Sequence, residues 1–122
     1  MAPRYLIVDD NRAFLDAAES LLKRQGLDVV GVATTIEEAL GRARELSPDV
    51  VLVDIMLGDE SGFDLARLLV EDGSTPGPGV ILISTQHESD FADLISESPA
   101  LGFVPKSELS ARAIERLVDG RD

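Results

Sequence analysis

Five short apolar runs alternate along the chain with segments in which apolar residues recur at helical spacing. This alternation favours βα units around a parallel sheet, because successive parallel strands must be joined by a crossover, which is usually a helix. Strands are predicted at residues 4–8, 28–33, 50–53, 80–83 and 102–104. The sequence therefore predicts an α/β fold.

The segments between these runs predict five helices. The first has an apolar face from Phe14 to Leu22 with Asn11 as its N-cap, and the second follows a capping-box pattern at residues 34–37. The others are predicted at residues 63–70, about 89–95 and about 108–118. The Gly- and Pro-rich segment 73–79 is expected to be an internal loop, since too little chain follows it for another domain. We therefore expect one domain, residues 1–122.

Composition narrows the possible functions. The formal net charge of −12 disfavours direct binding to nucleic acid, whose phosphates select basic surfaces. The absence of cysteine excludes disulfides, thiolate metal sites and a cysteine nucleophile. The chain has no apolar stretch of membrane-spanning length, and its first residues lack the regions of a signal peptide. A cytoplasmic protein is the expectation.

Charged side chains stand at the ends of three predicted strands. Asp9 and Asp10 follow the first strand, Asp54 follows the third and Lys106 lies just beyond the fifth. In a parallel sheet the carboxyl ends of the strands share one edge, which is where such sheets place their ligands. Two carboxylates about 4 Å apart repel by roughly 4 kcal/mol at an effective dielectric of 20. The cluster therefore calls for a cation, and a divalent metal is expected.

Four motifs in chain order, at residues 6–10, 51–54, 81–84 and 103–106, resemble the receiver domain of bacterial two-component response regulators. Each motif is weak alone, but their order and their places on the predicted strands make coincidence improbable. The resemblance extends over essentially the whole chain. It implies a flavodoxin-like fold, with a doubly wound five-stranded parallel sheet of strand order 2-1-3-4-5.

The resemblance also implies a metal site. Asp9 and Asp10 would hold Mg²⁺ directly or through water, together with Asp54 and the backbone carbonyl of Met56. Magnesium prefers six oxygen ligands and keeps several waters, so this ligand set suits it.

By the same resemblance, Asp54 is the phosphoacceptor, Lys106 pairs with a phosphoryl oxygen and the Ser84 hydroxyl donates to another. Ser84 and Phe103 would form the switch that passes the change to the face of the fourth helix, fifth strand and fifth helix. Such a domain is not a classical enzyme, because it catalyses only its own phosphorylation and dephosphorylation.

The implied partners are a sensor histidine kinase or a phosphotransfer protein as donor. A downstream effector or output domain would bind the switching face, and the resemblance also allows a homodimer that forms on phosphorylation. Two departures from the common family pattern stand out: Gly58 occupies a position where many receivers have Pro, and Pro105 precedes Lys106 instead of a Pro following it. Met56 and Gln86 occupy positions that tune phosphate lifetime in the family.

Structural readings remain open for single residues. Asp9 or Asp10 alone could cap the next helix, Ser84 could be a turn residue, Lys106 a solvated lysine and Phe103 ordinary core. Two alternative functions are a phosphate-independent interaction module and the receiver part of a truncated DNA-binding response regulator. A haloacid dehalogenase-type phosphatase is rejected, because that family needs a second Asp two positions after its nucleophile and Asn11 stands there.

Overall fold

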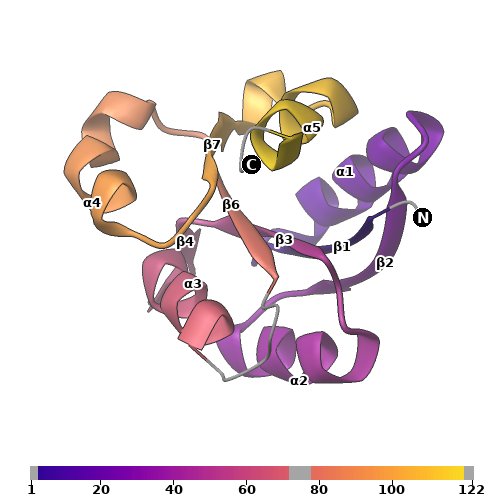
Figure 1. Cartoon of the computed structure of the whole chain (residues 1–122), viewed down its shortest axis with the longest axis horizontal. Helices are drawn as coiled ribbons and strands as arrows, with labels where there is room; N and C mark the ends of the chain where they lie inside the picture. The colour runs from indigo at the N-terminus through magenta and orange to yellow at the C-terminus, as the bar shows by residue number, and fades with distance from the viewer. Residues whose placement is uncertain (1–2, 72–77, 120–122) are drawn as a thin grey trace.

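A parallel sheet of five strands lies at the centre of the structure (Figure 1). The computed structural model describes residues 3–71 and 78–119. The strands are β1 (Arg4–Val8), β2 (Asp28–Ala33), β3 (Val50–Asp54), β6 (Gly79–Ser84) and β7 (Gly102–Pro105). They are arranged β2-β1-β3-β6-β7. Counted along the chain, the order of these five strands is 2-1-3-4-5, which confirms the prediction and the flavodoxin-like fold.

Helices cover both faces of the sheet. The helices are α1 (Arg12–Arg24), α2 (Ile36–Leu46), α3 (Gly62–Glu71), α4 (Ala92–Glu97) and α5 (Ala111–Asp119). In Figure 1, α1 and α5 lie on one side of the sheet and α2 and α3 on the other. The two-sided cover explains why β3 and β6 are buried at every position, as expected of parallel strands between two helical layers.

The alternation of side chains along each strand builds two cores. On β1, Leu6 and Val8 pack towards α2 and α3, whereas Tyr5 and Ile7 pack towards α1 and α5. The same division continues on β3 and β6. Because both cores draw on the same strands, the strand ends that carry polar side chains are held rigidly from both faces.

The last two helices differ from the prediction. The fourth, predicted at about 89–95, is a 3₁₀ turn (Glu88–Phe91) followed by α4, which ends at Glu97. The fifth begins at Ala111 instead of at about 108, because residues 106–108 form another 3₁₀ turn. Leu109, which we had assigned to the helix, lies before it but is buried. Short segments with few apolar residues carry weak periodicity, which explains both differences.

A two-stranded antiparallel hairpin was missed. It consists of β4 (Met56–Leu57) and β5 (Glu60–Ser61), one residue after Asp54, in a segment where no strand is predicted. Gly58 in its turn has φ +62°, a left-handed conformation that Pro cannot adopt. The chain therefore follows a path here that the common family pattern with Pro would not allow.

Helix capping was predicted partly correctly. Asn11 caps α1 by accepting a hydrogen bond from the Phe14 N–H, as expected. The capping box of α2 lies one residue later than predicted: the Glu38 N–H donates to Thr35 Oγ1, and the Glu38 carboxylate accepts from the Thr34 N–H. The later register follows from the extended backbone of Thr35, which makes it the N-cap.

The Gly- and Pro-rich loop predicted at 73–79 falls mostly on residues 72–77, which lie outside the described part of the chain. Among the helices of residues 3–71 and 78–119, none combines the length and apolar character needed to cross a membrane.

Candidate functional site

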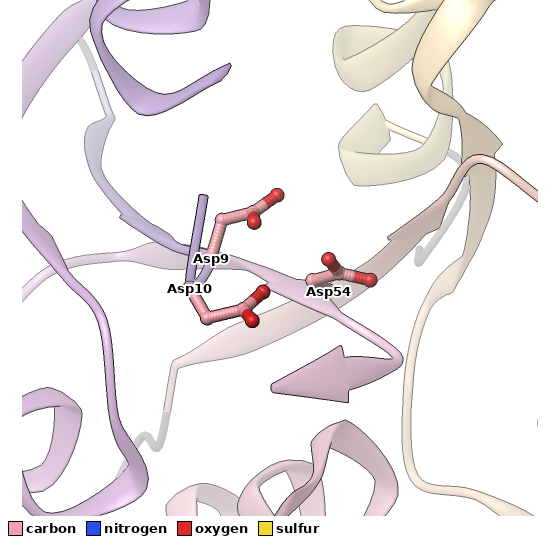
Figure 2. Close-up of side chains that lie close together, drawn as sticks. All are labelled: Asp9, Asp10 and Asp54. Atoms are coloured by element: carbon pink, nitrogen blue, oxygen red, sulfur yellow. The ribbon is translucent and has the colours of Figure 1, made fainter. Parts of the chain in front are cut away.

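Three aspartates meet at the carboxyl ends of β1 and β3. Asp9 and Asp10 follow β1 directly, and Asp54 is the last residue of β3. Because the two strands are neighbours in register, their ends lie side by side. One carboxylate oxygen from each of Asp9, Asp10 and Asp54 lies within 4.8 Å of the others. Figure 2 shows the three carboxylates gathered around a common space, so the structure brings together the acids that the sequence placed at one edge.

Burial divides the three acids. Asp9 is fully buried and Asp54 is 7% exposed, whereas Asp10 faces solvent. A buried carboxylate needs partners or a nearby cation, because an isolated charge is costly to remove from water. Asp54 Oδ1 accepts a hydrogen bond from the Met56 N–H at 3.1 Å.

Lys106 supplies a positive charge to the same cluster. Its Nζ lies 2.5 Å from Asp9 Oδ2 and 3.0 Å from Asp54 Oδ2, and its side chain is 11% exposed. The lysine is positioned by β7, which pairs with β6 so that Pro105 lies opposite Ser84. The structural reading of Lys106 as a solvated surface lysine is therefore wrong.

The pKa values of this group reflect its burial. Burial raises the pKa of Asp54 above its ordinary value, and the charge of Asp9 adds to the rise, although hydrogen bonds from Lys106 and the Met56 N–H oppose it. For Lys106, burial alone would lower the pKa, but its bonds to Asp9 and Asp54 outweigh burial and raise it. The lysine is thus held in its charged form beside the acids.

The site has the chemistry of a divalent-metal site. Apart from its ion pair with Lys106, the buried Asp9 Oδ2 has no hydrogen-bond partner among the described residues. Three carboxylates that share a single ammonium fit a hard cation that takes oxygen ligands. The residues therefore fit Mg²⁺.

Ser84, Met56 and Gln86 lie around the acids on neighbouring elements. Ser84 ends β6, is 2% exposed, and its Oγ accepts a hydrogen bond from the Gln86 N–H at 3.0 Å. The Gln86 side-chain amide in turn reaches Met56 Sδ at 3.7 Å, and Met56 is 52% exposed. The two side chains lie across the opening between β4 and the end of β6. The sole histidine, His87, is exposed.

Phe103 lies on β7, opposite Leu82 of β6. It is half-buried and packs against the core on the α2 and α3 side. It also lines an open cavity of about 390 Å³ beside α5, with Arg112 and Arg116. Phe103 thus contacts the core on one side and forms part of the wall of this cavity.

Sequence reasoning missed two residues of the site. Gly62 begins α3, and a Cβ there would stand 2.0 Å from the Asp54 carbonyl oxygen. The ring of Phe14 lies under Lys106, with Nζ 4.2 Å from its centroid. A glycine eight residues after Asp54 gave no signal on its own, and Phe14 was assigned only to the apolar face of its helix.

The family model of the response regulator receiver domain matches residues 5–118. The chain belongs to the response regulator receiver domain family. Among curated relatives of this receiver domain, it is 32% identical over 115 residues to the response regulator GacA of Pseudomonas viridiflava, covering 93% of this chain and 53% of that protein. It is 33% identical over 123 residues to the DNA-binding response regulator MtrA of Mycobacterium tuberculosis, covering 96% of this chain and 51% of that protein.

Solved receiver domains share the fold. The signal receiver domain of the putative response regulator NarL from Mycobacterium tuberculosis has a TM-score of 0.81 at 26% identity, with 98% of this chain and 95% of that chain covered. The response regulator domain of CheB from Thermotoga maritima has a TM-score of 0.77 at 25% identity, with 98% and 96% covered. This receiver domain spans about half the length of the curated relatives it matches.

Proposed function

We propose that Asp54 accepts a phosphoryl group in a reaction that depends on Mg²⁺, and that this modification is the signal the domain transmits. One observation carries the proposal: the buried Asp54 carboxylate lies between two further acids and the ammonium of Lys106. A structural Asp at a strand end needs neither a lysine at 3.0 Å nor two acidic neighbours. The arrangement is suited to a nucleophile whose product carries more negative charge than it does.

In the transfer, a carboxylate oxygen of Asp54 forms the new O–P bond while the bond from phosphorus to the donor breaks. The donor group leaves with the bonding electron pair and takes a proton from water. Phosphoryl transfer asks little covalent help from the protein but needs neutralisation of the charge on the equatorial oxygens. Lys106 provides one positive charge at the required place, and its buried position strengthens its effect.

Asp9 and Asp10 are proposed to hold the magnesium ion, with Asp54 and the Met56 carbonyl completing the protein ligands. When bound, the ion supplies charge neutralisation and orientation for the phosphoryl oxygens. The difference in exposure assigns different tasks to the two acids. Asp9 is fixed by burial and by its bond from the Asn11 N–H, whereas the exposed Asp10 is free to reach the ion through water.

Ser84 and Phe103 are proposed to convert the modification into a change of surface. In the structure the Ser84 Oγ is engaged by the Gln86 N–H. A phosphoryl group on Asp54 would offer new acceptors to the Ser84 hydroxyl, and Phe103 could turn inward behind it, away from the cavity beside α5. The face of α4, β7 and α5 would then shift from one of its two conformations towards the other. The size of this shift depends on how differently the two conformations bind the phosphoryl group.

The proposed donor is a histidine kinase or a phosphotransfer protein, and the proposed receiver of the signal is an effector or output domain that binds this face. The same face is also proposed to form a homodimer on phosphorylation. We place the reaction in the cytoplasm and propose no direct contact of this acidic chain with nucleic acid. Because the matched relatives are about twice as long and include a DNA-binding response regulator, the chain could serve as the receiver part of such a regulator.

The test is phosphorylation by acetyl phosphate in the presence of Mg²⁺, followed by intact-protein mass spectrometry. We expect the wild-type chain to gain one phosphoryl group, and Asp54→Ala to gain none. Asp59→Asn is the matched control, since Asp59 is an exposed acid on the adjacent hairpin and should leave labelling unchanged. A chain that is never labelled, or is labelled equally after Asp54→Ala, would contradict the proposal.

A phosphate-independent interaction module is the alternative. It predicts the same partner binding with and without beryllofluoride, which mimics the phosphoryl group. The retained set of Asp9, Asp54, Ser84 and Lys106 in one buried site argues against it, because a module that never binds phosphate gains nothing from burying those charges.

A further inference from the structure

The ring of Phe14 contacts the ammonium of Lys106 from below. Nζ lies 4.2 Å from the ring centroid, well within the range of a cation–π interaction. Phe14 is half-buried on α1, at the edge of the core shared with α5. Nothing in the proposed function so far uses this aromatic side chain.

The position of Phe14 is fixed by the turn that begins at the acidic cluster. The Asn11 N–H donates to Asp9 Oδ1 at 2.9 Å, and Asn11 Oδ1 accepts from the Phe14 N–H at 3.2 Å. The first turn of α1 is therefore tied directly to the buried acid. As a result, the backbone from which the ring extends is held by the helix cap.

Lys106 closes this chain of contacts. Its ammonium contacts Asp9 Oδ2, so that Asp9, Asn11, Phe14 and Lys106 form a closed ring of contacts. The ring joins the end of β1, the start of α1 and the 3₁₀ turn after β7. Asp54, whose Oδ2 lies 3.0 Å from Nζ, completes the surroundings of the ammonium. The four-carbon side chain of lysine is intrinsically flexible. The position of the Lys106 ammonium therefore depends on these neighbours.

We propose that Phe14 is a positioning residue for phosphoryl transfer, whose ring face holds the ammonium of Lys106 against Asp54 and limits the access of water to it. This inference rests on the proposed function of Asp54. Without the ring, the flexible lysine would spend part of its time away from the reacting oxygens. The expected loss of rate is about twofold to thirtyfold, which corresponds to the range of cation–π interactions.

The test compares Phe14→Leu with Phe14→Tyr in the full chain. Leu keeps the apolar bulk but removes the ring face, whereas Tyr keeps the ring. We expect Phe14→Leu to slow phosphorylation by acetyl phosphate within the stated range, and Phe14→Tyr to remain within about twofold of wild type. Leu21→Ala is the control for a general weakening of α1, since Leu21 is half-buried on the same helix. It should leave the rate unchanged.

Nuclear magnetic resonance supplies a readout that loss of stability does not move. Methylene protons beside Nζ should be shifted upfield by the ring in wild type and in Phe14→Tyr, and the shift should vanish in Phe14→Leu. Equal rates for Phe14→Leu and wild type, or equal losses in Leu and Tyr variants, would overturn the proposal. A wild-type chain that is never phosphorylated would overturn the proposed function, while the methylene shift would still report whether the contact forms.

Discussion

The carbonyl oxygen of Asp54 lies only 2.0 Å from the point where residue 62 would carry a Cβ. The Gly62 N–H also donates to the Ile55 carbonyl at 2.7 Å, so the start of α3 is pressed against the end of β3. This close approach ties the backbone of the proposed phosphoacceptor to a helix. The position of Asp54 therefore depends on the absence of a side chain eight residues later.

Gly62→Ala should destabilise the fold by about 2–3 kcal/mol. The added methyl group can be accommodated only if the end of β3 or the start of α3 moves, and both are buried. The free energy of unfolding in urea measures the effect. Gly41→Ala is the matched control: Gly41 lies in α2 with nothing within 4 Å of its Cβ position, so this change should stabilise by about 0.5–1 kcal/mol. Equal effects at the two glycines would contradict the close contact.

Asp54→Asn should stabilise the metal-free protein at neutral pH, because it removes a carboxylate whose charged form is disfavoured by burial. The raised pKa of Asp54 means that the folded state holds its proton more tightly than the unfolded state. Stability of the wild type therefore falls as pH rises from the ordinary carboxyl range through the raised pKa, and the variant should lose this slope. Unfolding curves at several pH values without Mg²⁺ measure this pH dependence. If the free energy of unfolding changed with pH in the same way in wild type and variant, the raised pKa of Asp54 would be contradicted.

Magnesium should raise the melting temperature of the wild type. A ligand that binds only the folded state stabilises it by about 2.7 kcal/mol at a hundredfold excess over Kd. Asp10→Asn should weaken this gain without harming the fold, since Asp10 is exposed. Asp59→Asn should preserve it. If CaCl₂ and MgCl₂ left the melting temperature unchanged, the acidic cluster would not be a metal site.

Met56→Asn should shorten the lifetime of the phosphorylated protein several-fold. Met56 is apolar and half-exposed beside Gln86, whereas an amide there could hold a water near the phosphoryl group. Timed mass spectrometry after removal of the donor measures the decay. Leu94→Ala, a change at an exposed apolar residue of α4, serves as control. Decay at the wild-type rate would show that Met56 does not control water access.

Phe103→Ala should leave phosphorylation intact and weaken the response of the α4, β7 and α5 face. The ring is half-buried beside an open cavity, so its loss should remove the element that moves, and not the site itself. Amide chemical shifts with and without beryllofluoride measure the response. A variant whose shifts on α5 change as much as those of the wild type would exclude Phe103 as part of the switch.

The strands and their order were predictable because they depend on strong local signals. Each of the five runs is apolar and short, and crossovers between parallel strands follow a fixed hand, so few topologies remain. The same reasoning placed the site residues together, because the order of the strands fixes where the residue after each strand lies. These residues are Asp9, Asp10, Asp54 and Lys106. Their roles came from the resemblance, not from the geometry.

Details that depend on contacts across the fold were not predictable. The hairpin at residues 56–61 is too short to show a period, and α5 begins at Ala111 because the Gln25 side chain and Ser110 satisfy N–H groups there. The contact of Phe14 with Lys106 joins residues far apart in sequence, and a single sequence carries no record of such a pair. The one-residue shift of the α2 capping box is likewise decided by backbone geometry.

Gln25, at the end of α1, accepts a hydrogen bond from the Ala111 N–H, 86 residues away. This bond joins the end of the first helix to the beginning of the last, on the same side of the sheet. The Ala111 amide should then exchange its hydrogen more slowly than the exposed first turn of an unfastened helix would. The first helix thus holds the beginning of the last, and any movement that carries Ala111 away from Gln25 would break this bond.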